Sequence, residues 1–168
     1  MNNFKADLQY SLEERENEMF DNFYYRIFPN IAEIKFCEDM ATQRKGIDKI
    51  IYFENGNSFS VDEKKRRVDY GDILLELWSV YESRIRGWLY TTRCDYIVYA
   101  VMPTRKVFLL PTLLLKRAWM ANRNEWLRTY KTVIAKNKTY TTHSIPIPTN
   151  VLLDAIAKEM SHKFVNTS

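Results

Sequence analysis

The Glu-Asn-Gly-Asn tetrapeptide at residues 54–57 is the strongest local constraint on how this chain of 168 residues folds. Asn-Gly is strongly preferred in two-residue turns between antiparallel strands, because both turn positions require a positive φ. The flanking segments, Ile47–Phe53 and Ser58–Lys65, have the residue types and spacing of strands. The sequence therefore predicts an antiparallel hairpin, and its register decides which side chains lie opposite one another.

A helix and further strands are predicted around this hairpin. The capping box Ser11-Leu-Glu-Glu14 opens a helix that runs to about Phe28 and stops at Pro29. Residues 81–90 fit either a short helix or a loop. Three apolar segments are typical of strands, at Asp72–Val80, Asp95–Met102 and Lys106–Leu110.

The C-terminal part is predicted to be mainly helical. In chain order it holds a helix from Pro111 to about Asn122, a second from about Glu125 to Ala135, an extended segment at Thr139–Pro148, and a last helix beginning at Thr149 or Asn150. This element order predicts an α/β (α+β) fold with one mixed central sheet flanked by helices. At this length, residues 1–168 are expected to form a single domain.

The charge is unevenly distributed along the chain. The formal net charge is +4, yet residues 1–40 hold nine acids and four bases, whereas residues 103–140 hold nine bases and one acid. A basic half is what a phosphate-binding surface requires, and it is also compatible with an ordinary solvated helical face.

Several classes of protein are excluded by composition. Cys37 and Cys94 form no CxxC motif, so free thiols and a cytoplasmic location are expected. His143 and His162 lie far apart in the sequence, which gives a histidine-based zinc site no support. The most apolar run, VFLLPTLLL, is too short for a membrane span, so no membrane association is expected.

Three charged residues converge on one face of the predicted hairpin. Side chains alternate along a strand, so Asp62 and Lys64 share a face, and Phe59 and Val61 share the other. Asp48 begins the neighbouring strand, roughly opposite residues 62–63. Two carboxylates this close repel each other unless a cation lies between them, and Mg²⁺ prefers such oxygen ligands. A lysine beside the ion would orient water or stabilise charge on a phosphate.

This arrangement resembles the PD-(D/E)xK nuclease superfamily, which includes Holliday-junction resolvases, many restriction endonucleases and RecB-like nucleases. The resemblance rests on Asp48, a gap of 13 residues and then Asp62-Glu63-Lys64. It implies a restriction-endonuclease-like αβββαβ core over about residues 11–102, with a C-terminal strand and helices at about 106–162 outside it. The phrases TQRKGIDKII, SVDEKKRR and GWLYTTRCDYIVYAV are similar to those of small phage or mobile-element members.

The resemblance also implies an activity, which is hydrolysis of DNA phosphodiester bonds with Mg²⁺ or Mn²⁺. Asp48 and Asp62 would bind the metal, and Lys64 would act beside it. An acidic residue on the first helix often joins this site, and Glu16 is the matching position here. Glu16 lies in the middle of the apolar helix face, where pairing with a lysine or arginine is the alternative reading. Relatives of this type often act as dimers, so a homodimer is a further expectation.

Two basic clusters flank the predicted site and are candidates for binding DNA phosphates. They are Gln43, Arg44 and Lys45 before Asp48, and Lys65, Arg66 and Arg67 after Lys64. The alternatives are a solvated loop and an edge strand protected by charge.

Some questions stay open at this level. A second register, Glu63 with Lys65, fits the motif, although it would put Phe59 and Val61 on the metal face. Glu76 is either a further ligand or a structural partner of an arginine. Trp88 and Tyr90 either stack on a base or pack in the core. The rival function is a nuclease-like fold that binds nucleic acid or a partner protein without cutting, and a structural accessory protein is a third.

Overall fold

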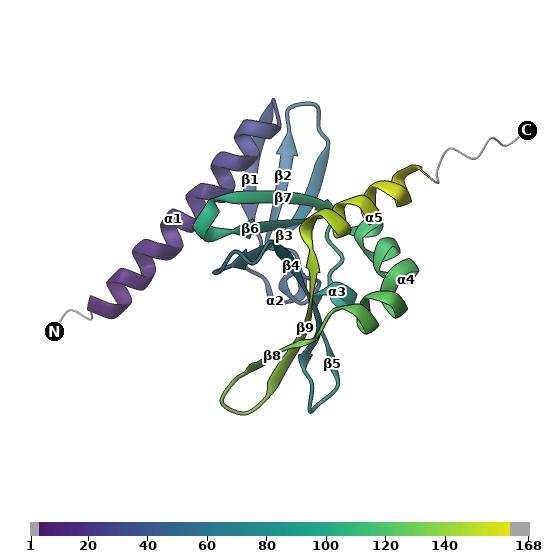
Figure 1. Cartoon of the computed structure of the whole chain (residues 1–168). Helices are drawn as coiled ribbons and strands as arrows, with labels where there is room; N and C mark the ends of the chain where they lie inside the picture. The colour runs from purple at the N-terminus through teal and green to yellow at the C-terminus, as the bar shows by residue number, and fades with distance from the viewer. Residues whose placement is uncertain (1–3, 162–168) are drawn as a thin grey trace, which may run out of the picture.

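The computed structural model describes the backbone of residues 4–161 and the side chains of residues 15–161. These residues form two β-sheets with helices packed on them (Figure 1). In chain order the elements are α1 (Phe4–Ile27), β1 (Ile31–Phe36), α2 (Met40–Gln43), β2 (Lys49–Phe53), β3 (Ser58–Arg66), β4 (Asp72–Val80), β5 (Ile85–Arg86), α3 (Trp88–Thr91), β6 (Tyr96–Val101), β7 (Lys106–Pro111), α4 (Thr112–Thr129), β8 (Val133–Lys136), β9 (Thr141–Pro148) and α5 (Thr149–Ser161).

The first sheet has five strands in the order β1-β2-β3-β6-β7. β1, β2 and β3 are antiparallel neighbours, β6 runs parallel to β3, and β7 returns antiparallel to β6. Helix α1 covers one face of this sheet, where Phe20 and Tyr24 pack with Val61, Val98 and Ala100.

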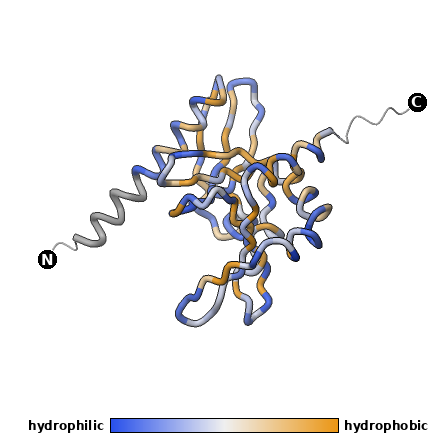
Figure 2. The backbone as a smooth tube through the Cα atoms, viewed as in Figure 1, coloured by the Kyte–Doolittle hydropathy of each residue, from blue (hydrophilic) through white to orange (hydrophobic). Residues whose placement is uncertain are grey.

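The second sheet has four strands in the order β5-β4-β9-β8. Its apolar residues join the other face of the first sheet and the helices α4 and α5 in one larger core. Members of this core include Ile73, Leu75, Ile97, Leu115, Trp119, Ile145 and Leu152. Figure 2 shows hydrophobic stretches along the central strands, with hydrophilic residues at the turns and along α4.

The predicted α+β class and its mixed central sheet are confirmed, but the strands form two sheets where one was expected. The segment Asp72–Val80 is a strand as expected, yet it pairs with β9, about seventy residues later in the sequence, and not with the hairpin. The third strand beside the hairpin is β1, at Ile31–Phe36, which was not predicted. Pairing between distant segments depends on packing that local patterns do not encode.

The ends of several helices also differ from expectation. Helix α1 begins at Phe4, so Ser11 lies within the helix and does not cap it. The two helices predicted after Pro111 are one, because α4 continues through Asn122, whose side-chain amide donates to the carbonyl of Ala118 at 2.8 Å. Residues 133–136 form strand β8. Helix α5 begins at Thr149, one of the two residues predicted to cap it.

The segment that remained undecided, residues 81–90, is a turn followed by β5 and α3. No helix within residues 4–161 is long and apolar enough to cross a membrane.

Gly87 holds this segment against β4. A Cβ atom built at Gly87 would lie 2.3 Å from the carbonyl oxygen of Glu76, and the Gly87 N–H donates to the carbonyl of Leu77 at 2.9 Å. Backbone atoms cannot move aside as a flexible side chain would.

We therefore predict that Gly87→Ala destabilises the protein by about 1–3 kcal/mol, because overpacking forces the backbone to shift. Thermal unfolding followed by circular dichroism measures the change. Ser83→Ala, at an exposed position of the preceding turn, is the control and should leave the melting temperature unchanged. Equal melting temperatures for Gly87→Ala and the parent protein would show that the contact with Glu76 is not tight.

Candidate functional site at the end of the hairpin

The predicted hairpin forms, and its register fixes the faces of β3. Ile51 pairs with Phe59, and Lys49 pairs with Val61 at the end of the hairpin away from its turn. Asp48 therefore lies just outside this final pair. On the other side of β3, Asp62 pairs with Ile97 and Lys64 with Tyr99, both of which belong to the larger core. Asp62 and Lys64 therefore face away from α1.

Asp48 is held against β3 by the backbone. Its own N–H donates to the carbonyl of Val61 at 2.8 Å. Its Oδ2 accepts a hydrogen bond from the N–H of Glu63 at 2.7 Å. Both bonds fix the carboxylate of Asp48 next to Asp62.

Asp62 is a nearly fully buried carboxylate with an incomplete set of partners. It is 1% exposed; its Oδ1 is paired with the ammonium group of Lys64, while its buried Oδ2 has no hydrogen-bond partner among the residues that the structure describes. Burial raises the pKa of Asp62 to about 6; Lys64 opposes this rise and the carboxylate of Asp48 adds to it. The cluster thus contains two neighbouring carboxyl groups and an unused oxygen atom, which fits a bound cation.

The opposite face of β3 carries a second, complete charge network. The ammonium of Lys49, fully buried, lies 2.8 Å from Asp21 Oδ1 and 3.0 Å from Glu63 Oε1. The hydroxyl of Tyr24 donates to Glu63 at 2.8 Å. The alternative register of the motif, Glu63 with Lys65, therefore lies on the face covered by α1. The ion pair of Lys49 with Asp21 was not predicted from the sequence. The available signal was a lysine at the start of the otherwise apolar strand KIIYF.

The structure does not bring Glu16 to the two aspartates. Its buried carboxylate lies 3.0 Å from the ammonium of Lys65 and also pairs with Arg67. Burial opposes ionisation of Glu16, but its hydrogen bonds to Lys65 and Arg67 and their positive charges lower its pKa overall. Since Lys65 sits beside Ala100 on the α1 face, the sheet separates Glu16 from Asp62. This geometry matches the alternative reading of Glu16 as a partner of basic residues.

The second basic cluster is largely engaged in ion pairs. Besides the pairs of Lys65 and Arg67 with Glu16, Arg66 lies 3.2 Å from Asp72 at the start of β4. The side chain of Arg66 is 17% exposed, so it serves as a link between the two sheets. Arg67, at 66%, is the most exposed of the three.

The first basic cluster is more accessible. Arg44 and Lys45 are exposed and line a surface hollow together with Tyr90 and Arg93. Gln43 instead donates to the carbonyl of Cys37 at 3.4 Å. Arg93 was missed by the sequence analysis, because it approaches Lys45 through tertiary contact: its N–H donates to the Lys45 carbonyl at 2.7 Å.

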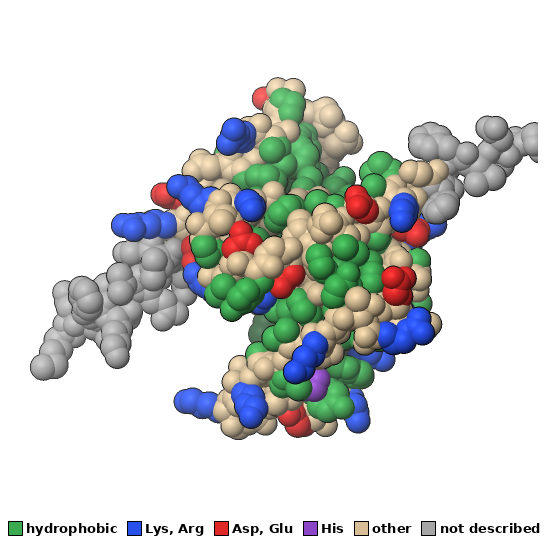
Figure 3. Space-filling model, viewed as in Figure 1, with side chains coloured by type: hydrophobic (Ala, Val, Ile, Leu, Met, Phe, Trp, Pro, Cys, Tyr) green, Lys and Arg blue, Asp and Glu red, His purple; other side chains and the backbone are tan. Residues whose placement is uncertain are grey.

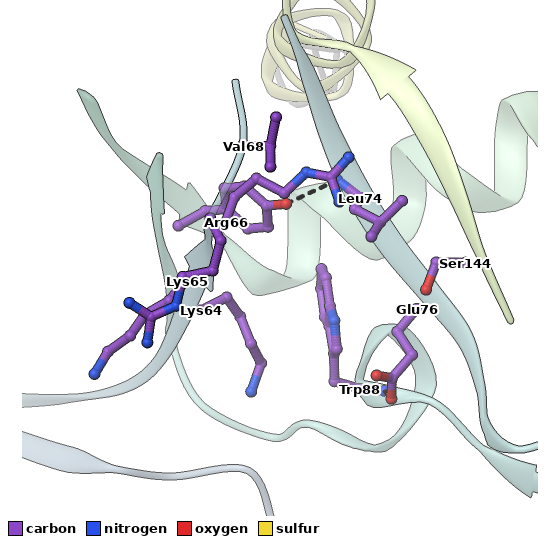
Figure 4. Close-up of a pocket in the computed structure, with 10 residues that line it drawn as sticks. Lys64, Lys65, Arg66, Val68, Leu74, Glu76, Trp88 and Ser144 are labelled. Carbon is purple, nitrogen blue, oxygen red and sulfur yellow. Dashed lines mark hydrogen bonds between the residues drawn. The ribbon is translucent and has the colours of Figure 1, made fainter. Parts of the chain in front are cut away.

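A cavity of about 450 Å³ opens beside Lys64, between the two sheets (Figure 4). In that view the ring of Trp88 stands between the ammonium of Lys64 and the carboxylate of Glu76. The carboxylate of Glu76 accepts a hydrogen bond from the backbone N–H of Trp88 at 3.3 Å. Among the described residues Glu76 pairs with no arginine, so its predicted role as the structural partner of an arginine is not observed. The cavity is lined by Lys64, Lys65, Arg66, Arg67, Val68, Leu74, Glu76, Trp88, Tyr99 and Ser144.

Comparison with protein-family models, with curated proteins and with solved structures found no match to this chain. Within the described residues, no group of three or more aspartate, glutamate, histidine or cysteine side chains is arranged to hold a metal ion. The pair of Asp48 and Asp62 is smaller than such a group. Mg²⁺ is commonly bound by one or two carboxylates together with water and substrate oxygens, so the pair has the number of carboxylates that such a site uses.

The raised pKa of Asp62 predicts a stability penalty at neutral pH. A group whose folded-state pKa is about 6 and whose ordinary value is 3.8 holds its proton longer in the folded state. Its contribution to the free energy of unfolding therefore falls as pH rises from about 4 to about 6. Asp62→Asn removes the charge and should stabilise the protein at pH 7 by up to about 3 kcal/mol.

Urea unfolding between pH 4 and pH 7, with a chelator present, measures this effect. The curve of stability against pH should be flatter for Asp62→Asn than for the parent protein. Asp154→Asn, which removes an exposed carboxylate from α5, is the control. A variant that is destabilised at pH 7 would show that the charge of Asp62 contributes net stability through Lys64.

Proposed function

We propose that the protein is a metal-dependent nuclease that hydrolyses phosphodiester bonds in DNA, of the PD-(D/E)xK type. The observation that supports this most directly is the buried, partly unsatisfied carboxylate of Asp62, held beside Asp48 and on the same face as Lys64. Such a cluster is costly for a fold to maintain, and perturbed carboxylates of this kind concentrate at functional sites.

The order of elements supports the same proposal. Helix α1 precedes three antiparallel strands, β1 to β3, and α3 precedes β6, which runs parallel to β3. Apart from three inserted elements, this is the order helix, three strands, helix, strand that the resemblance implies. The short helix α2 is inserted between β1 and β2, and the strands β4 and β5, which belong to the second sheet, are inserted between β3 and α3.

Each residue of the cluster has a definite task in this proposal. Asp48 and Asp62 would hold Mg²⁺ or Mn²⁺, which supplies Lewis-acid polarisation of the phosphate when bound. Lys64 lines the cavity, and its ammonium would stabilise the negative charge that develops on the phosphate. Glu16 has no direct task, and positions Lys65 and Arg67.

The rival function is a nuclease-like fold that binds nucleic acid without cutting it. The observation in its favour is the Lys64–Asp62 ion pair, which compensates the charge of Asp62 without a metal ion. The two functions differ in whether the two aspartates bind a divalent cation.

A lysine outside the cavity provides a matched control for the test of nuclease activity. We predict that Lys64→Ala lowers Mn²⁺-dependent cleavage of plasmid DNA by about a hundredfold or more, a loss typical when a group that stabilises transition-state charge is removed. Lys158→Ala removes an equal charge from an exposed position of α5 and should retain most of the cleavage. Thermal melts check that both variants fold. Full cleavage by Lys64→Ala would rule out the assigned role of Lys64.

Metal binding is tested separately by isothermal titration of Mn²⁺ into the parent protein and into Asp62→Asn. The expected result is binding at sub-millimolar concentration that is lost in the variant, because one of the two carboxylates no longer carries charge. Absence of binding to the parent protein would favour the non-cutting rival.

A further inference from the structure

A second surface rich in arginine and aromatic rings lies on the four-stranded sheet. We call it the aromatic–arginine surface, and define it as Trp78, Tyr81, Arg84, Arg86 and His143. The guanidinium carbon of Arg86 lies 4.1 Å from the ring centre of Trp78, and that of Arg84 lies 4.8 Å from the ring centre of Tyr81. The ring of His143 stacks on Tyr81 at 3.9 Å, with the two planes 5° apart.

The two arginines of this surface carry unneutralised charge. Among the described residues, neither Arg84 nor Arg86 forms an ion pair or a side-chain hydrogen bond, and both are exposed. The carboxylate nearest in sequence, Glu82, is already bonded to the N–H and hydroxyl of Thr141. The guanidinium edges are therefore free to donate to an external anion.

Arg84 is also held in an unfavourable backbone conformation. Its φ is +57°, in the left-handed region, and its N–H closes the turn by donating to the carbonyl of Tyr81 at 3.1 Å. Glycine or asparagine occupies such a position with less strain. An arginine at a position that disfavours it points to a use for its side chain.

The surface is adjacent to the cavity beside Lys64. Trp78 follows the cavity residue Glu76 by two positions along β4, which is about 7 Å in a strand. Arg86 is joined to Trp88, also a cavity residue, through Gly87. Figure 3 shows a histidine, in purple, at the lower end of the molecule, with hydrophobic and basic side chains around it.

We propose that the aromatic–arginine surface binds unpaired DNA, so that the substrate of the proposed nuclease contains a single-stranded segment. This inference rests on the proposed function for its link to cleavage. Guanidinium planes and aromatic rings stack on exposed bases, and free guanidinium edges bind phosphates. In a duplex the bases stack on each other and present no free faces, so duplex DNA uses only the charge of this surface. An acidic peptide would likewise use the charge and leave the rings unused.

The test is fluorescence anisotropy with labelled oligothymidylate and a duplex of the same length, in EDTA so that no cleavage occurs. The parent protein should bind the single strand about tenfold or more tightly than the duplex. The double variant Arg84→Gly with Arg86→Gln should lose about tenfold of its affinity for the single strand. Its melting temperature should not fall, since glycine relieves the strain at position 84.

The matched control is Arg123→Gln with Arg128→Gln, which removes two exposed arginines from α4. It should retain the preference for the single strand. Equal losses in the two double variants, equal affinity for strand and duplex, absence of binding, or equally effective displacement by polyglutamate would each overturn the proposal.

Failure of this inference is distinguishable from failure of the nuclease proposal. Single-strand binding in EDTA without any Mn²⁺-dependent cleavage would retain the surface and reject the nuclease. Cleavage that depends on Lys64, with single-strand affinity unchanged in the Arg84 and Arg86 double variant, would retain the nuclease and reject the surface.

Discussion

The pairing of β2 with β3 is the constraint on which the rest of the site depends. Asp48 and Val61 are joined by a backbone hydrogen bond, and the Glu63 N–H holds the Asp48 carboxylate just beyond it. A slip of one residue would exchange the two faces of β3. It would place Asp62 and Lys64 under α1 and turn Val61 out of its cluster. The apolar cluster under α1 and the charged cluster on the other face therefore specify the same register.

The two faces of β3 differ in how completely their charges are matched. Under α1, the buried ammonium of Lys49 has two carboxylate partners, and one of them, Glu63, also accepts a hydrogen bond from Tyr24. On the opposite face, Asp62 has a single basic partner among the described residues, and its second carboxylate oxygen has none. A buried charge is stabilised only when its partners are complete. The network under α1 is therefore complete as structure, whereas the cluster of Asp62 leaves one buried oxygen unmatched, and this contrast distinguishes the two faces.

The sequence predicted what local patterns control and missed what distant packing decides. The Asn-Gly turn and the alternation of side chains correctly placed Asp62 and Lys64 on one face and Asp48 beside them. The neighbour of β2 on its other side, β1, was missed, because the segment IAEIKF is mostly exposed and has no apolar alternation. Glu16 was correctly identified as an unusual carboxylate in an apolar helix face. Its partners, Lys65 and Arg67, depend on how α1 crosses the sheet, which no sequence pattern reports.

The division of the strands into two sheets explains why the cavity lies beside Lys64. Beyond Val61, β3 continues to Arg66, and within residues 4–161 β6 is the only strand that pairs with this part of it. The chain then turns into β4 of the second sheet. The ion pair between Arg66 and Asp72 joins the sheets where they diverge. A single continuous sheet would have placed a strand where the cavity now opens. Because the cavity has one wall from each sheet, a ligand bound there would contact Lys64 of the first sheet and Glu76 and Ser144 of the second at once.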